Sequence, residues 1–184
     1  MNRSILYICV FLAAATASAS DAHPQSSHHS AYASEAKSDI ASLSADELTQ
    51  LESGAGMGFA RAAELNSYPG PQHVLDAAEA LGLTEPQRKE TQRIFDAMKS
   101  DAVRIGREII EKERHLSQRF QHRHIDERVL RELASELGLL RAELRVAHLR
   151  AHLSVASLLS AEQIERYDEL RGYSRDGKRA DHEH

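Results

Sequence analysis

The middle of the chain carries two apolar stripes whose neighbouring members are mostly three or four residues apart. The first stripe consists of Phe95, Met98, Ala102, Ile105, Ile109, Leu116 and Phe120. The second consists of Leu130, Leu133, Leu137, Leu140, Leu144, Ala147, Ala151, Val155 and Leu158. Alternating steps of three and four place side chains along one side of a helix, as in a coiled-coil seam. The pattern therefore predicts two long helices, and Lys112 or Glu113 interrupts the first stripe.

A polar, histidine-rich segment, residues 121–125, separates the two stripes, and we expect it to form a tight turn. Asp126, which follows it, is a favourable N-cap for the second helix. Two seams of similar length joined by a short turn pack as an antiparallel pair. We therefore expect an all-α fold built on a long antiparallel helical hairpin, with shorter helices flanking it.

Three copies of a capping box mark the positions where helices begin. In residues 43–47, 83–87 and 159–163, a leucine precedes Ser or Thr, and Glu or Gln follows three residues later. The hydroxyl accepts from the backbone N–H three residues on, and the Glu or Gln side chain bonds back to the N–H of the Ser or Thr. The last copy predicts a helix over residues 160–172 that folds back across the hairpin.

Glycine and proline divide the region before the hairpin. A first helix is predicted over residues 44–66. Three glycines are expected to bend it, at Gly54, Gly56 and Gly58. Residues 67–71, Ser-Tyr-Pro-Gly-Pro, must break it, because two prolines and a glycine cannot continue a helix. A short helix is then predicted over residues 71–80, ended by Gly82.

The two ends of the chain differ in composition from the middle. Residues 1–19 read as a cleavable secretory signal, with a basic start, an apolar run too short to span a bilayer and a small-x-small end. Residues 20–42, rich in Ser, Ala and His, are expected to form a flexible leader, and residues 174–184 a polar, histidine-containing tail. The helical hairpin domain is then residues 43–173, and we expect the protein to be exported to the periplasm.

Composition removes several classes of function. The single cysteine, Cys9, lies within the predicted signal, so the mature chain would hold no disulfide, thiolate metal site or cysteine nucleophile. The net charge is −5 with both signs interleaved, which argues against a nucleic-acid-binding face. Residues 54–58 are glycine-rich but lack the Lys-Ser/Thr of a phosphate loop, and no cofactor fingerprint or catalytic motif is present. We predict that the protein is not an enzyme and has no organic cofactor.

The strongest candidate for chemistry is a pair of histidines, His148 and His152. Spaced by four on a helix, they share one face and can bind one metal ion. Further ligands could come from His73, Glu64, Met57 or a partner subunit. Imidazole and carboxylate suit Zn, Ni or Cu(II), and the Met57 thioether would favour Cu(I). The alternative is that both are ordinary boundary histidines with hydrogen bonds to carbonyls or acids.

Other histidines form a second, looser possibility for metal uptake. They are the terminal residues His23, His28, His29, His182 and His184 and the turn residues His122 and His124. Histidine-rich tracts of this kind take up metal, but polar tails and solvated loops have the same composition.

The helix that carries the histidine pair is apolar on two sides. Val146, Leu149 and Leu153 lie away from the stripe that contains Leu144. This second side must face another helix, a partner chain or an unfolded client protein.

Two of the capping boxes carry a family resemblance. They are the segments around Leu83, Thr84 and Gln87 and around Leu159, Ser160 and Gln163. Their placement before the hairpin and before the last helix resembles the paired LTxxQ motifs of the periplasmic Spy/CpxP superfamily. Residues 56–71 look like the heavy-metal sensor and resistance branch of that group. The resemblance implies a hooked helical hairpin that dimerises.

The resemblance also implies a type of metal site. The sensors of this branch hold metal through helix histidines spaced by four, with a carboxylate and a thioether. His148 and His152 match one such pair, whereas residues 44–66 contain no histidine to match the other.

We expect a non-enzymatic envelope-stress or heavy-metal-responsive protein that forms a homodimer and binds divalent metal. Two other functions fit the resemblance. One is an ATP-independent holdase chaperone for unfolded envelope proteins. The other is an adaptor that docks on a membrane-bound sensor kinase or anti-sigma factor.

Overall fold

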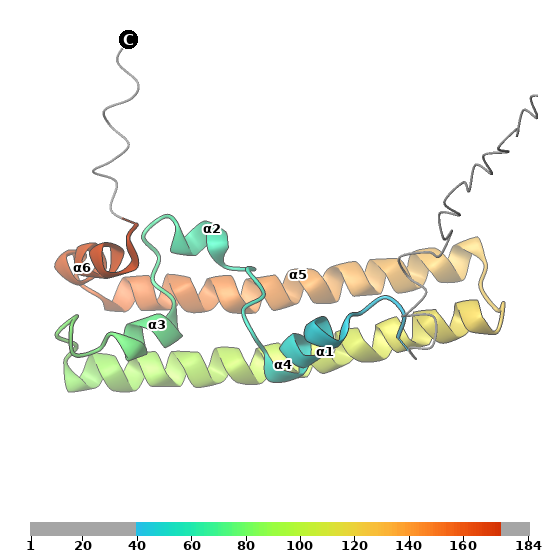
Figure 1. Ribbon diagram of the computed structural model, residues 1–184, viewed down its shortest axis with the longest axis horizontal. Coiled ribbons are helices and arrows are strands. Elements are labelled where there is room, and N and C mark those ends of the chain that lie inside the picture. The colour runs from blue at the N-terminus through green and yellow to red at the C-terminus, as the bar shows by residue number, and fades with distance from the viewer. Residues whose placement is uncertain (1–39, 174–184) are drawn as a thin grey trace, which may run out of the picture. The chain divides into compact units, whose positions relative to one another are not determined.

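The computed structural model describes residues 40–173, and all regular secondary structure within them is helical (Figure 1). The helices are α1 (Ala45–Ser53), α2 (Arg61–Glu64), α3 (Pro71–Asp76), α4 (Glu85–Gln121), α5 (Glu127–Leu158) and α6 (Ala161–Arg171). The two long helices, α4 and α5, lie side by side and run in opposite directions. The predicted all-α fold with a long antiparallel hairpin is confirmed. No helix in this part of the chain is long and apolar enough to cross a membrane.

The predicted seams form the centre of the hairpin. Ile105 and Ile109 of α4 are buried in one cluster with Leu137 and Leu144 of α5. The interruption predicted at Lys112 or Glu113 falls on a buried carboxylate. Glu113 accepts hydrogen bonds from Ser42 Oγ at 2.7 Å and Arg141 at 2.8 Å. These two donors satisfy an acid that would otherwise be costly to bury.

The two seams end in the tight turn that the sequence predicts. α4 ends at Gln121, and the Asp126 carboxylate accepts a 2.8 Å hydrogen bond from the backbone N–H of Val129, which caps α5. The seam is not buried along its whole length, however. Phe120, beside the turn, is 55% exposed.

The first helix is much shorter than predicted, so the expectation of one bent helix over residues 44–66 is wrong. Gly54 is left-handed, with φ of 63°, and its N–H bonds to the carbonyls of the last turn of α1. A left-handed glycine in this position ends a helix and satisfies its free carbonyls. In the rest of the predicted range, residues 54–66, the only α-helix is the four-residue α2.

Two further boundaries also differ from the sequence predictions. α3 ends at Asp76 rather than near residue 80, and residues 77–82 continue as turns up to Gly82, with φ of 60°. The end of the predicted leader packs on the hairpin, because Ile40 is buried in the core cluster of Leu51 and Ile109. Ile40 therefore belongs to the packed domain and not to a flexible segment. The predicted signal, the rest of the leader and the tail lie outside the described residues.

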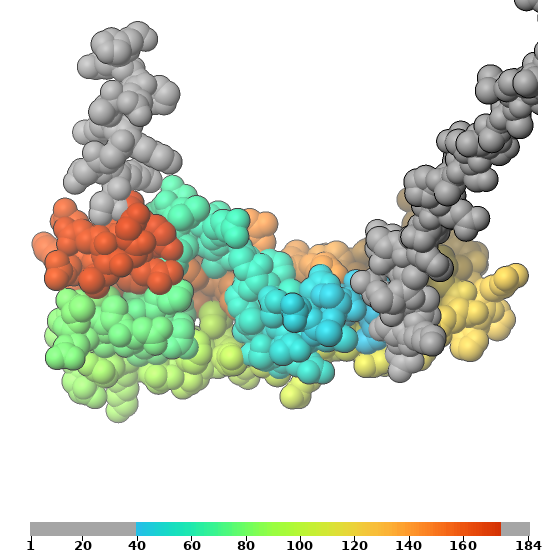
Figure 2. Space-filling model, viewed as in Figure 1, coloured from blue at the N-terminus to red at the C-terminus, as the bar shows by residue number. Residues whose placement is uncertain are grey.

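The short helices cover one face of the hairpin (Figure 1). α1 packs on α4, α2 packs on α5, and α3 contacts both long helices. Figure 2 shows α6 over the open end of the hairpin. There Tyr167 is fully buried in a second core cluster with Val74 of α3 and Val155 of α5.

All three capping boxes form as predicted, and two of them bond to each other. The Nε2 of Gln87 donates to Oε1 of Gln163 at 2.9 Å, and the Nε2 of Gln163 donates back to Oε1 of Gln87 at 3.2 Å. The Gln87 amide also donates to the Leu158 carbonyl, and the Gln163 amide donates to the Leu81 carbonyl. These bonds tie the start of α4 to the start of α6 and close the open end of the hairpin.

Candidate functional site

The two histidines predicted to bind metal lie one turn apart on α5, and 3% of His148 and 8% of His152 is exposed. Both line a cavity of about 590 Å³ beside the hairpin. Its walls come from the connection between α1 and α2, from α2, from the start of α3 and from α4. All three further ligands predicted from the sequence, Met57, Glu64 and His73, line this same cavity. The fold therefore gathers the whole predicted set around one space.

The ring of His152 is oriented by a backbone carbonyl. Its Nδ1 lies 2.7 Å from the carbonyl oxygen of Tyr68. A carbonyl can only accept, so Nδ1 carries the proton and Nε2 keeps its lone pair in the neutral ring. This is the arrangement in which metal-binding histidines are commonly held.

The ring of His148 is buried with one nitrogen unsatisfied. Its Nε2 has no hydrogen-bond partner among residues 40–173. The ring stacks on Phe59, with the two centroids 6.1 Å apart. Burial lowers the pKa of His148, and the nearby His152 lowers it further. The imidazole is therefore held neutral, with a buried nitrogen that requires a partner.

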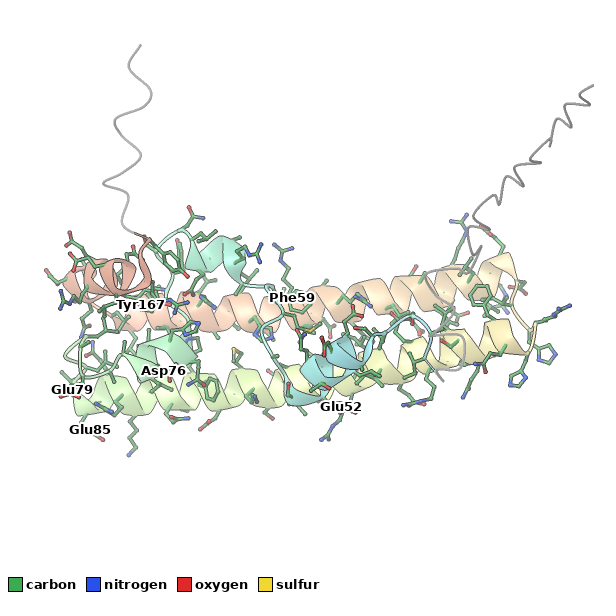
Figure 3. The ribbon with its side chains drawn as sticks, in the orientation of Figure 1. Glu52, Phe59, Asp76, Glu79, Glu85 and Tyr167 are labelled. Atoms are coloured by element: carbon green, nitrogen blue, oxygen red, sulfur yellow. The ribbon has the colours of Figure 1, made fainter. Side chains whose placement is uncertain are left out.

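The carboxylate of Glu64 connects α2 to α6. Its Oε1 accepts a hydrogen bond from the Tyr167 hydroxyl and lies 3.5 Å from Arg171 Nε. Its Oε2 lies 3.7 Å from His152 Nδ1. Burial raises the pKa of Tyr167, and the bond to Glu64 raises it further, so the phenol remains a donor. Figure 3 shows Tyr167 where α6 meets α5, and Phe59 beside α5.

Gly70 keeps a space open between the imidazole and the carboxylate. A Cβ at this position would lie 2.9 Å from His152 Cε1, 3.2 Å from His152 Nε2 and 3.3 Å from Glu64 Oε2. The φ of Gly70 is −82°, which any residue can adopt, so the backbone does not demand glycine here. Lack of a side chain is what leaves room beside both groups.

The donor set fits a transition metal, but the side chains are not assembled around one point. Among the described residues, no three His, Cys, Asp or Glu side chains are placed to hold one ion. Glu64 is engaged by α6, and His73 lies 3.9 Å from Asp76 with its side chain half exposed. Neutral imidazoles, a carboxylate and a thioether are ligands that Zn, Ni and Cu accept. Binding through more than two side chains therefore requires a change of rotamer.

Several residues of this site were not predicted individually from the sequence. Phe59, Tyr68 and Gly70 lie within the segment that resembles the heavy-metal branch, but nothing in their spacing gives them a role, and Arg171 is one of many charged residues. Tyr167 has the apolar spacing of a core residue on α6. Only the fold reveals that its hydroxyl meets Glu64.

The other predicted sites have different environments. The turn residues His122 and His124 are exposed, with ring centroids 6.3 Å apart. The terminal histidines lie outside the described residues. On the far side of α5, Val146 is 48% exposed and Leu153 58% exposed, while Leu149 is partly buried. The predicted second apolar side of this helix is therefore an open surface.

These features define an all-helical hairpin protein whose two capping boxes are bonded together and whose α5 histidines line a cavity. Residues 70–171, more than half of the chain, match the family described as LTXXQ motif family protein, and the chain belongs to this family. The match supports the resemblance to the Spy/CpxP-type superfamily, whose members are non-enzymatic helical proteins, typically periplasmic. No curated protein and no solved structure matches the chain.

Proposed function

We propose that this protein is a periplasmic, non-enzymatic member of the heavy-metal-responsive branch of its family and that it binds a divalent metal ion. The observation that carries the proposal is the buried Nε2 of His148. It has no hydrogen-bond partner within residues 40–173, and it belongs to a cavity that four other side chains of metal-binding type also line. A metal ion would give this nitrogen the partner that a buried polar group needs.

The residues divide into ligands and supports. His148 and His152 would bind through Nε2, and Glu64 would supply Oε2, which faces His152. Tyr68 would orient His152 by holding its Nδ1 proton. This set suits Zn, Ni or Cu(II).

Two further residues would determine whether the site prefers Cu(I) or a divalent ion. Met57 and His73 line the cavity and would complete the coordination. Entry of the Met57 thioether would shift the preference toward Cu(I), whereas His73 would retain the preference for the divalent ions.

Calorimetric titration with Zn²⁺, Ni²⁺ and Cu²⁺ tests the assignment. The variant is His148→Ala/His152→Ala, and the matched control is His122→Ala/His124→Ala, which removes two exposed histidines at the turn. We expect one ion per chain to bind the wild type and the turn variant but not the α5 variant. Equal binding by all three proteins would place the metal elsewhere.

A second candidate function rests on the open side of α5. Val146 and Leu153 are about half exposed, and Leu139 on the same helix is 66% exposed. Exposed apolar side chains of this kind mark surfaces that meet other proteins. They suit an ATP-independent holdase that shields unfolded envelope proteins, or the interface of a homodimer.

Aggregation assays and sedimentation separate these roles. Under the holdase reading, Val146→Ser/Leu153→Ser reduces suppression of client aggregation without ATP, and a chelator has no effect. Under the dimer reading, the same variant lowers the sedimentation coefficient. If neither changes, this surface serves neither role.

A further inference from the structure

We infer that Arg171 is a built-in cation that occupies the carboxylate of the candidate metal site, and that a bound divalent ion and the Arg171–Glu64 ion pair exclude one another. The inference rests on the proposed function, because it concerns how that site is regulated. On this inference, the contacts of Arg171 at the end of α6 change when a metal ion binds.

The contacts of Glu64 show what balances its charge. Only 13% of its side chain is exposed, and Arg171 Nε lies 3.5 Å from its Oε1. Its other basic neighbour is His152, 3.7 Å away, whose proton on Nδ1 is already directed to the Tyr68 carbonyl. The Nδ1 proton of His152 is thus committed to the Tyr68 carbonyl, whereas the guanidinium of Arg171 is a permanent cation beside the buried carboxylate.

A divalent ion beside the two imidazoles would take over that role. It would carry twice the charge of Arg171 and would repel the guanidinium at short range. The Tyr167 hydroxyl also bonds to Glu64, but it is neutral and competes with no cation. Tyr167 is therefore a positioning residue for Glu64, and Arg171 is the competitor.

Tyr173 offers Arg171 an alternative partner when its ion pair with Glu64 is broken. Its Nη2 donates to the Tyr173 hydroxyl at 3.3 Å, and its guanidinium lies 5.6 Å from the centroid of the Tyr173 ring. It is also the last residue of α6, followed by Gly172 in the left-handed conformation. The side chain can move at a helix end without leaving itself unpaired.

Competition between Arg171 and the ion changes the metal affinity in the opposite direction from a purely structural role of Arg171. A residue that merely supports the fold weakens binding when it is replaced. A competing cation strengthens binding when it is removed, because the carboxylate no longer has to exchange partners. By linkage, ion binding must weaken the Arg171–Glu64 pair by the same factor.

The test compares variants of the full chain by calorimetry with Zn²⁺ and Ni²⁺. In Arg171→Gln we expect the affinity to rise at least about threefold, the size of a partly exposed ion pair. Arg171→Lys keeps the charge and should remain near the wild type. Arg166→Gln is the matched control, because it removes the same charge from the same helix where Arg166 pairs with Glu169 at 3.1 Å. Its affinity should not change.

A second readout follows Arg171 directly. In the wild type, exchange of the Arg171 Nε–H with water, measured by NMR, should become faster as Zn²⁺ saturates the site. If Arg171→Gln perturbs folding, as judged by circular dichroism, Arg171→Met keeps the apolar stem and removes the charge. It should show the same gain in affinity.

Three outcomes would overturn the inference. If the metal affinity is unchanged or lower in both Arg171→Gln and Arg171→Met, Arg171 has only a structural role. An equal gain in Arg166→Gln makes the effect one of overall charge. A wild type that binds neither ion removes the proposed function, and the inference with it. Binding by the wild type with no gain on loss of Arg171 removes the inference alone.

Discussion

Gly106 tests whether α1 is seated on the hairpin as described. It lies in the middle of α4, where a Cβ would come 2.3 Å from the carbonyl oxygen of Leu51 and 2.9 Å from its carbonyl carbon. Both atoms belong to the backbone of α1, so no side-chain rotation can relieve the contact. In Gly106→Ala, α1 has to move away by on the order of 1 Å to restore an ordinary contact distance.

Two opposing effects set the magnitude. Alanine in a helix interior is favoured over glycine by about 1 kcal/mol. Overpacking of a closed contact costs about 1–3 kcal/mol, and partial exposure of Leu51, now 4% exposed, adds to the loss. We therefore expect Gly106→Ala to lower the free energy of unfolding by about 1–2 kcal/mol.

Gly138 provides the control. It also lies inside a long helix, α5, but apart from its chain neighbours and the adjacent backbone of α5, no atom of the described residues comes within 4 Å of the position of its Cβ. Gly138→Ala should therefore raise the free energy of unfolding by about 0.5–1 kcal/mol. Urea denaturation followed by circular dichroism at 222 nm measures both changes. If Gly106→Ala stabilises the protein as much as Gly138→Ala, α1 does not pack against Gly106.

Three other predictions concern the site and the bonded capping boxes. Gly70→Ala should lower Zn²⁺ affinity at least about tenfold in calorimetry, because its Cβ would occupy the space beside His152 Nε2, and an unchanged affinity would place the ion elsewhere. Gln163→Glu should keep the N-terminal cap of α6 but lose the amide donor to Gln87, lowering the free energy of unfolding in urea by about 1–2 kcal/mol; no loss would show that the cross-helix bonds contribute nothing. Because the pKa of His148 is lowered in the folded state, the unfolded chain takes up this proton more readily in acid. The His148 contribution to stability is therefore complete at neutral pH. It declines as the pH falls through the pKa of His148 in the unfolded chain and below, by at most about 1.4 kcal/mol per pH unit. In denaturation series from pH 7 to 5, His148→Phe should reduce this slope.

Local patterns were enough to predict most of the hairpin. The spacing of apolar residues identified α4 and α5, and the hydroxyl of Thr84 or Ser160 marked each helix start to within one residue. These features depend on neighbours a few positions apart, and such neighbours are visible in the chain.

Glycine was harder to interpret. The sequence shows that Gly54 disturbs a helix, but bending and ending a helix use the same residue. Gly54 is left-handed, and a Cβ at this position would lie 3.0–3.2 Å from Ala102 and Val103 of α4, which are distant in the chain. The same limit hid Gly70, whose role depends on His152.

The glutamines of two capping boxes have a second role that the sequence motif does not predict. A capping box accepts either Glu or Gln, and Glu47 serves in α1. At Gln87 and Gln163 the amide also donates across helices, which a carboxylate cannot do. For the site, the helical spacing predicted that His148 and His152 share a face. That Glu64 lines the same cavity depends on the packing of α2 against α5, which the spacing of residues in the chain does not reveal.

The most direct test of the metal site is crystallographic. Crystals of the protein grown with Zn²⁺ or Ni²⁺, with anomalous diffraction recorded at the metal edge, locate the ion without reference to any variant. We predict one strong peak in the cavity, about 2.0–2.2 Å from Nε2 of both His148 and His152. An empty cavity, with peaks only at His122 and His124 or at the chain ends, would contradict the account.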